Sequence, residues 1–148
     1  DCQRMARRDG SRGEGRAGAS WRTTDVGSFD RATLEETVYD LYDAEGYDVE
    51  WAAPSAEGDV VLVARRSRLV RSALTTVVSV ATAGTSVTPG SVDRLDYARG
   101  MNGADRAALV TTASVDGATR DAAAATKVSL VDGETLRGRL ADSDLAPP

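Results

Sequence analysis

Two apolar runs near the middle of the chain organise its pattern of hydrophobic and polar positions. Val60–Val63 and Leu74–Val80 are rich in β-branched residues, which favour β-strands. A Glu-Gly-Asp turn precedes the first run, and an arginine-rich segment separates it from the second. This pattern predicts two strands joined as a long hairpin. We expect both strands to lie at the centre of a sheet, because strand and helix patterns alternate after them.

Before the hairpin, the pattern predicts one helix and one strand. Apolar residues recur at helical spacing over 31–45, after the candidate caps Ser28 and Asp30. Gly46 then stands where a helix commonly ends. Tyr47–Trp51 alternates apolar and polar residues, as an edge or half-exposed strand does.

After the hairpin, helix and strand patterns alternate to the end of the chain. They comprise a helix from Ser91 to about Met101, a strand at 107–112, a helix at about 116–125, a strand at 127–131 and a helix at about 134–140. The resulting order, αβββαβαβα, predicts an α/β fold with a mixed sheet flanked by helices.

A chain of 148 residues has the length of one domain. We assign this domain to residues 28–141 and expect a loose C-terminus at 142–148. Residues 1–27 are rich in arginine, glycine and serine and lack periodicity, so we expect a disordered basic tail. Two interpretations of this tail stay open: it is a basic arm that contacts phosphate groups, or it has no binding role. The chain begins with Asp, so it could be a fragment.

Composition excludes several kinds of chemistry. The chain has no histidine, which removes Ser-His-Asp catalysis and histidine-ligated zinc. Cys2 is the only cysteine, so neither an intrachain disulfide nor a cysteine-ligated metal site can form. No apolar run approaches the ~20 residues needed to cross a bilayer, and no signal peptide is visible. We therefore expect a cytoplasmic protein that does not enter a membrane.

Four segments carry a resemblance to a known family. They read LEETVYDLYDAEGYDVEW (34–51), GDVVLVARR (58–66), ALVTTASVDGATRDAAA (108–124) and VSLVDGETL (128–136). Each is weak alone, but as an ordered set over about 31–140 they resemble the Mrr-type restriction endonuclease domain. The resemblance implies a restriction-endonuclease-like fold and Mg²⁺-dependent hydrolysis of DNA, which is often modified DNA.

The departures from this family fall on its active site. The metal-binding Asp of the family corresponds to Val61, and its Gln-x-Lys or Glu-x-Lys corresponds to Val78, Ser79 and Val80. A Mg²⁺ ion requires oxygen ligands, and the lysine orients water and neutralises developing charge. Valine does neither. The helix glutamate of the family is matched by Glu35.

Neighbouring residues could rebuild such a site. Asp59 lies two positions before Val61 and would share its strand face, while Glu57 lies in the turn. With Glu35 they would form an acidic cluster able to hold Mg²⁺, and Arg65 would lie on the face of Asp59. The other reading is that Asp59 and Glu57 are ordinary solvated turn residues. Lys127 precedes a different strand and is a poor substitute for the missing lysine.

A basic cluster in the predicted hairpin suits contact with a DNA backbone, although a solvated loop would have the same composition. Its members are Arg65, Arg66, Arg68 and Arg71. Trp21 and Trp51 could stack on bases, but a tryptophan at a strand end such as Trp51 is more typical of core packing.

Two readings of function stay open. The resemblance implies a DNA-cleaving enzyme that uses Mg²⁺. The residues at the active-site positions favour a relative that binds DNA or a protein without hydrolysis and without a cofactor. A third possibility is a purely structural module within a larger restriction or repair protein. The chain could also form a homodimer or belong to a larger multi-domain protein.

Overall fold

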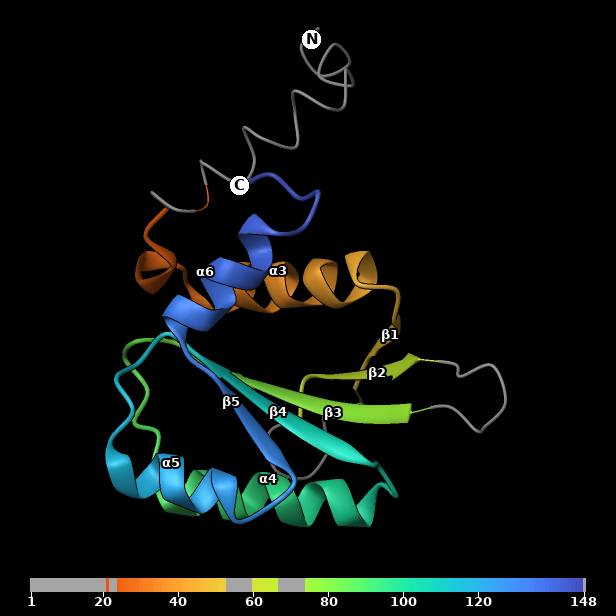
Figure 1. The fold of residues 1–148 in the computed structure, drawn as a ribbon, viewed down its shortest axis with the longest axis vertical. Coiled ribbons are helices and arrows are strands. Elements are labelled where there is room, and N and C mark those ends of the chain that lie inside the picture. Colours follow the sequence, from red (N-terminus) through yellow and green to blue (C-terminus); the bar gives the residue numbers. More distant parts are fainter. Residues whose placement is uncertain (1–20, 22–23, 53–59, 67–73, 148) are drawn as a thin grey trace, which may run out of the picture.

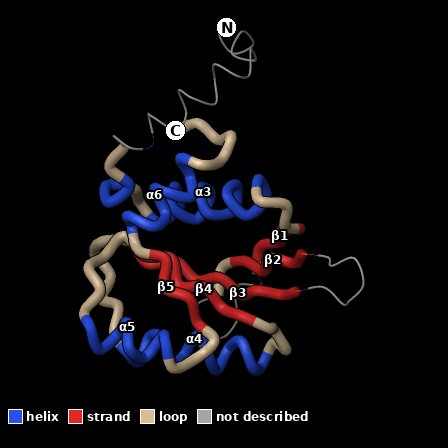
Figure 2. The backbone as a smooth tube through the Cα atoms, viewed as in Figure 1, coloured by secondary structure: helices blue, strands red, loops and turns tan. Residues whose placement is uncertain are grey.

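A five-stranded mixed sheet lies between two layers of helices (Figure 1). This computed structural model describes residues 21, 24–52, 60–66 and 74–147. Helices α3 and α6 cover one face of the sheet, and α4 and α5 cover the other (Figure 2). In chain order the elements are η1 (Val26–Ser28), α3 (Arg31–Ala44), β1 (Asp48–Trp51), β2 (Leu62–Arg66), β3 (Leu74–Ala81), α4 (Pro89–Met101), β4 (Arg106–Thr111), α5 (Gly117–Ala124), β5 (Val128–Val131) and α6 (Gly133–Ala141).

The strands lie in the sheet in the order in which they occur in the chain, so β3 is central. The pairs β1–β2 and β2–β3 are antiparallel, whereas β3–β4 and β4–β5 are parallel and are connected through α4 and α5. This arrangement confirms the predicted mixed sheet flanked by helices and the predicted hairpin. It also places the last residues of β3, β4 and β5 at one end of the sheet.

A β-bulge interrupts the beginning of β2. Leu62 faces Val78 in the register, yet the backbone N–H of Val61 also donates to the Val78 carbonyl at 2.8 Å. Two residues of one strand therefore face one residue of the other. As a result, Val61 and Leu62 both pack on the α3/α6 side of the sheet, while Val60 packs on the α4/α5 side.

Beyond the bulge, strict alternation builds two separate cores. In β3, Val78 and Val80 face α3 and α6, whereas Val77 and Ala81 face α4 and α5. Each fully buried Val or Leu side chain contributes about 1.5–3 kcal/mol to the stability of the fold. Because β3 is buried on both faces, its sequence LTTVVSVA does not alternate apolar and charged residues, which is typical of a strand covered on both sides.

Side-chain caps fix where the helices begin. Asp30 caps α3, Asp116 caps α5 and Asp132 caps α6, each accepting a hydrogen bond from a backbone N–H three residues on. The prediction that Ser91 caps the helix after the hairpin is wrong. Thr88 is the cap, and Pro89 occupies the first helical position, to which proline is suited. The Thr88 hydroxyl accepts the backbone N–H of Ser91, and the Ser91 hydroxyl accepts the backbone N–H of Thr88.

Residues near both chain ends pack into the α3/α6 core. Trp21 and Val26 lie within the stretch 1–27 that we expected to be a disordered tail, yet their side chains are only 1 % and 2 % exposed. The indole Nε1 of Trp21 donates a hydrogen bond to the carbonyl of Leu145 at 2.8 Å. This bond connects Trp21 to the stretch 142–148, which we expected to be a loose C-terminus. The expectation of disorder thus fails at Trp21 and Val26, and residues 1–20 lie outside the described part of the chain. Among the residues described, no helix has the length and apolar character to span a bilayer.

Candidate functional site

The two sites predicted from the sequence lie at opposite ends of the β2–β3 hairpin. Val61 lies beside Val78, near the end of the sheet where β3, β4 and β5 finish. Arg65 and Arg66 lie at the other end, where those three strands begin. Four residue steps separate Leu62 from Arg66, which corresponds to about 13 Å along an extended strand. The candidate catalytic positions and the candidate DNA-binding arginines are therefore two distinct regions.

At the first region, the positions that the resemblance aligns with the family's catalytic residues are part of the hydrophobic core. Val78 and Val80 are 0 % and 3 % exposed and pack in one cluster with Leu34 of α3. Val61 is partly buried against the same cluster. A divalent cation requires several oxygen ligands and usually retains water, and these positions supply neither. The residues that the structure places here do not fit Mg²⁺.

The acidic residues proposed to rebuild the site are not brought together among the described residues. The Glu35 carboxylate is held in an ion pair with Arg31 of the same helix, at 2.7 Å. Asp59 and Glu57 lie outside the described part of the chain. Within the part that is described, no group of three or more Asp, Glu, Cys or His residues is placed to hold a metal ion.

Two further carboxylates lie where β4 and β5 finish, but both serve as helix caps. Hydrogen bonds from Thr119 lower the pKa of Asp116. The backbone N–H of Thr135 does the same for the pKa of Asp132, and Arg120 pairs with that carboxylate at 3.1 Å. A lowered pKa keeps each group ionised, so neither is suited to act as a general acid near neutral pH.

At the second region, Arg65 and Arg66 point to opposite faces of the sheet, because they are consecutive strand residues. Arg65 pairs with Glu50 of β1 at 3.4 Å. The guanidinium of Arg66 lies 5.4 Å from the centre of the Tyr47 ring, on the α3/α6 side. Arg68 and Arg71 lie outside the described residues.

The bulge bears on the expected neighbourhood of Arg65. The sequence predicted that Val61 and Arg65 lie on the same face of the strand. That prediction requires side chains to alternate without interruption along β2. The inserted residue breaks that alternation, so Val61 lies on the α3/α6 face and Arg65 on the other. An Asp59–Arg65 pairing can no longer be inferred from spacing alone.

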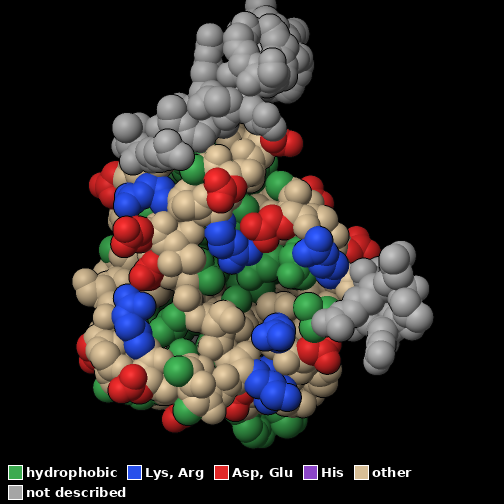
Figure 3. Space-filling view, in the orientation of Figure 1, with side chains coloured by type: hydrophobic (Ala, Val, Ile, Leu, Met, Phe, Trp, Pro, Cys, Tyr) green, Lys and Arg blue, Asp and Glu red, His purple; other side chains and the backbone are tan. Residues whose placement is uncertain are grey.

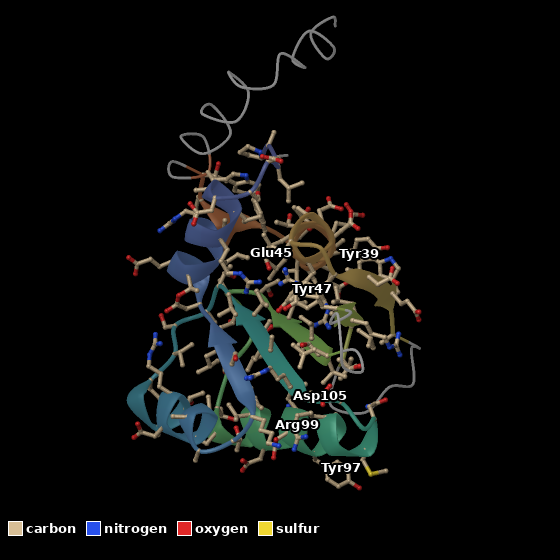
Figure 4. All side chains as sticks on the ribbon, turned by 45° about the vertical axis from the view of Figure 1, so that its right-hand side comes forward. Tyr39, Glu45, Tyr47, Tyr97, Arg99 and Asp105 are labelled. Carbon is tan, nitrogen blue, oxygen red and sulfur yellow. The ribbon has the colours of Figure 1, made fainter. Side chains whose placement is uncertain are left out.

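Trp51 does not pack in the core, so the prediction of core packing there is wrong. It is 51 % exposed at the end of β1, and its ring stacks on that of Tyr39 with centroids 4.8 Å apart. The Tyr39 hydroxyl donates to the Val49 carbonyl at 3.3 Å, on an edge strand. Figure 4 shows Tyr39 and Tyr47 on the same side of the molecule as Glu45. Trp21, in contrast, is buried and unavailable for stacking on a base.

Comparison with known proteins assigns the fold. The MspJI restriction endonuclease, solved in complex with a 27-mer oligonucleotide, superposes with a TM-score of 0.54 at 20 % identity, over 74 % of this chain and 27 % of that one. AspBHI, a DNA modification-dependent restriction endonuclease, gives 0.61 at 15 % identity, over 92 % of this chain and 37 % of that one. The fold is thus that of the restriction endonucleases, and this chain spans roughly a quarter to two fifths of the length of these two.

Sequence comparison then identifies the family. The family Mrr_cat, described as restriction endonuclease, matches residues 26–140. The chain belongs to this family of DNA nucleases, which confirms the resemblance read from the sequence. A search of curated proteins finds no match.

Proposed function

We propose that this domain is a member of the Mrr-type family that binds double-stranded DNA without cleaving it. It would act in the cytoplasm as one part of a larger protein or assembly. The burial of Val78 and Val80 in the α3/α6 core is the observation that carries the proposal. Hydrolysis in this family requires a metal-binding carboxylate and a lysine, and apolar side chains fill both positions here.

Family membership and the fold support DNA as the partner. A net charge of −5 does not favour a polyanion, so contact with DNA would depend on locally concentrated arginines. The hairpin arginines (65, 66, 68 and 71) are the candidates that the sequence supplies, with residues 1–20 as an additional basic arm.

The first test is a plasmid nicking assay with methylated and unmethylated DNA in the presence of Mg²⁺ or Mn²⁺. We expect no cleavage above background. If cleavage occurs, Asp59→Ala should be compared with Asp48→Ala, which removes one carboxylate from β1. Metal-dependent cleavage that disappears only in Asp59→Ala would overturn the proposal and reveal a relocated active site.

The second test measures duplex binding over a range of salt concentrations. Four arginines on phosphates would give a slope of about −3 to −4 in log K against log[salt]. An Arg65/Arg66/Arg68/Arg71→Ala variant should lose most of this dependence. A chain shortened to begin at Trp21 measures the contribution of the arm, and Trp21 is retained because it is buried. Absence of binding at low salt would favour the alternative, a protein-binding or structural module.

A further inference from the structure

Most arginines in the described part of the chain are neutralised by acidic neighbours. Ion pairs hold Arg31, Arg65, Arg99, Arg120 and Arg139. Among the described residues, four basic side chains make no ion pair, and these are Arg66, Arg106, Lys127 and Arg137. A cation without a counter-ion is available to an external anion without first breaking an ion pair, although Arg66 also lies 5.4 Å from the centre of the Tyr47 ring.

Three of these four side chains share one face of the sheet. Arg66 follows Ala64 by two residues in β2, and Arg106 precedes Ala108 by two in β4; both alanines pack toward α3 and α6. Lys127 directly precedes β5, in which Val131 packs on the same side, and the hydrogen bond from the Ala107 N–H to the Lys127 carbonyl continues the β4–β5 ladder to this residue. Because side chains two or four residues apart on a strand share a face, all three cations lie on the α3/α6 face.

The register places the three cations at one end of the sheet. Arg106 pairs with Thr76 at the start of the β3–β4 ladder, and Arg66 pairs with Leu74, two residues before Thr76. The N–H of Ala107 donates to the carbonyl of Lys127 at 3.0 Å, so Arg106 and Lys127 are lateral neighbours. With strands ~4.8 Å apart, the row from Arg66 to Lys127 extends across roughly 15 Å.

The helical layer does not cover this end of the sheet. Val131 is 4 % exposed beneath α6, whereas Ser129 and Lys127, on the same face of the same strand, are exposed. Arg66 and Arg106 are exposed as well. Figure 3 shows several Lys and Arg side chains on the side of the molecule in view, between the upper and lower helical layers.

The nearest acidic residue in the sequence does not neutralise the row. Asp105 precedes Arg106 at the beginning of β4 (Figure 4), and its carboxylate accepts the backbone N–H of Thr75 at 2.9 Å. Glu45, at the end of α3, is held by Arg139 through two contacts of 2.6 and 3.2 Å. The positive charge of the row is therefore left for a partner.

We propose that Arg66, Arg106 and Lys127 form a phosphate-binding row that holds the DNA backbone against the open end of the sheet. We call these three residues the cation row. This inference rests on the proposed function in DNA binding. The cation row lies at the end of the sheet where β2 finishes and β3 begins. Its cations would neutralise phosphates and position DNA without reading its sequence.

The test is a titration of the full chain with a short fluorescein-labelled duplex at several salt concentrations. Arg106→Gln and Lys127→Gln should each flatten the slope of log K against log[salt] by about 0.9 unit, and the double variant by about 1.8. Arg137→Gln is the matched control, because Arg137 also makes no ion pair but lies on α6. The thermal unfolding midpoint of each variant verifies that the fold is intact.

The outcomes separate this inference from the proposed function. A flatter slope in Arg106→Gln and Lys127→Gln, with Arg137→Gln unchanged, supports the cation row. Salt-dependent binding that is equal in all three variants would overturn the cation row and leave DNA binding intact. A full chain that shows no binding even at low salt would overturn both.

Discussion

A lysine at position 80 tests how apolar the surroundings of this side chain are, at the position that the resemblance aligns with the family's catalytic lysine. Val80 is 3 % exposed, and its cluster contains Leu34, Leu62 and Val78. A Val80→Lys substitution would return the family's side chain to a position that has no counter-ion among the cluster's residues. Full burial lowers the pKa of a lysine by up to about 3–5 units. At ~1.4 kcal/mol per unit, the ammonium form would cost about 4–7 kcal/mol.

The cost has a defined dependence on pH. Because burial lowers the pKa of the lysine in the folded state, the unfolded chain binds more protons between the folded and unfolded pKa values. Stability therefore rises with pH through this window and is lowest below it. Above the unfolded value of about 10.4, the amine is neutral in both states and the penalty disappears.

Urea unfolding of Val80→Lys and Val80→Met is the assay, with both variants measured between neutral pH and pH ~10. Methionine has similar length without charge, so the difference between the variants isolates the ammonium group. We expect Val80→Lys to be less stable by about 4–5 kcal/mol at neutral pH, because a lysine whose pKa falls below 7 is already neutral in the folded state, and we expect the gap to close toward pH ~10. A domain with a total stability of about 5–15 kcal/mol would be partly or wholly unfolded by this change.

Equal stability of the two variants at neutral pH would refute the reasoning. It would mean that a charge at position 80 reaches water or an anion, as it would in a working nuclease centre. A Val61→Asp/Val80→Lys double variant extends the test. If it is stabilised by Mg²⁺, the alignment of both positions with the family's active site is correct, even though the wild-type residues cannot use it.

The remaining predictions concern the chain termini and the helix caps. Trp21→Phe should destabilise the domain by about 1–3 kcal/mol in urea unfolding, since it removes the hydrogen bond to Leu145 and buried volume, while an unchanged midpoint would place Trp21 outside the core. Asp116 and Asp132 have lowered pKa values in the folded state. Their contribution to the stability of the fold is therefore present above the ordinary carboxyl pKa and is lost as the pH falls through their folded-state pKa values. Asp116→Asn/Asp132→Asn should retain the caps and make stability less steeply dependent on pH between about 4 and 2, and an unaltered acid profile would contradict this account.

The sequence alone was sufficient for the parts of the fold that depend on local patterns. Helix α3 begins after Asp30, and Gly46 follows its end with a φ of 96°, because a side-chain cap and a left-handed glycine are short-range features. The β2–β3 hairpin and the alternation of elements followed from runs of apolar residues and their order, and the family followed from the resemblance of four sequence segments in that order. The hypothesis that the catalytic residue types are missing also came from the sequence, since it concerns only which residue stands at each position that the resemblance aligns with the family's active site.

The tertiary structure decided what those residue types do. Trp21 and Trp51 are the same kind of side chain in weakly patterned surroundings, yet one is buried against Leu145 and the other lies half exposed on Tyr39. The difference arises from contacts between residues distant in the chain, which no local window contains. The bulge at Val61 is similar, because it is defined by the partner Val78 and reverses the face on which a side chain emerges.

The cation row shows the same division between sequence and structure. Arg106 and Lys127 each directly precede a buried strand, and parallel strands begin at one end of a sheet, so their proximity was available as a sequence signal. The sequence did not show whether Arg106 and Lys127 make ion pairs with acidic side chains. Their freedom depends on which acidic side chains the fold directs elsewhere, such as Asp105 to the backbone of Thr75. Charge is a property of the sequence, but the pairing of charges is set by the packing of segments far apart in the chain.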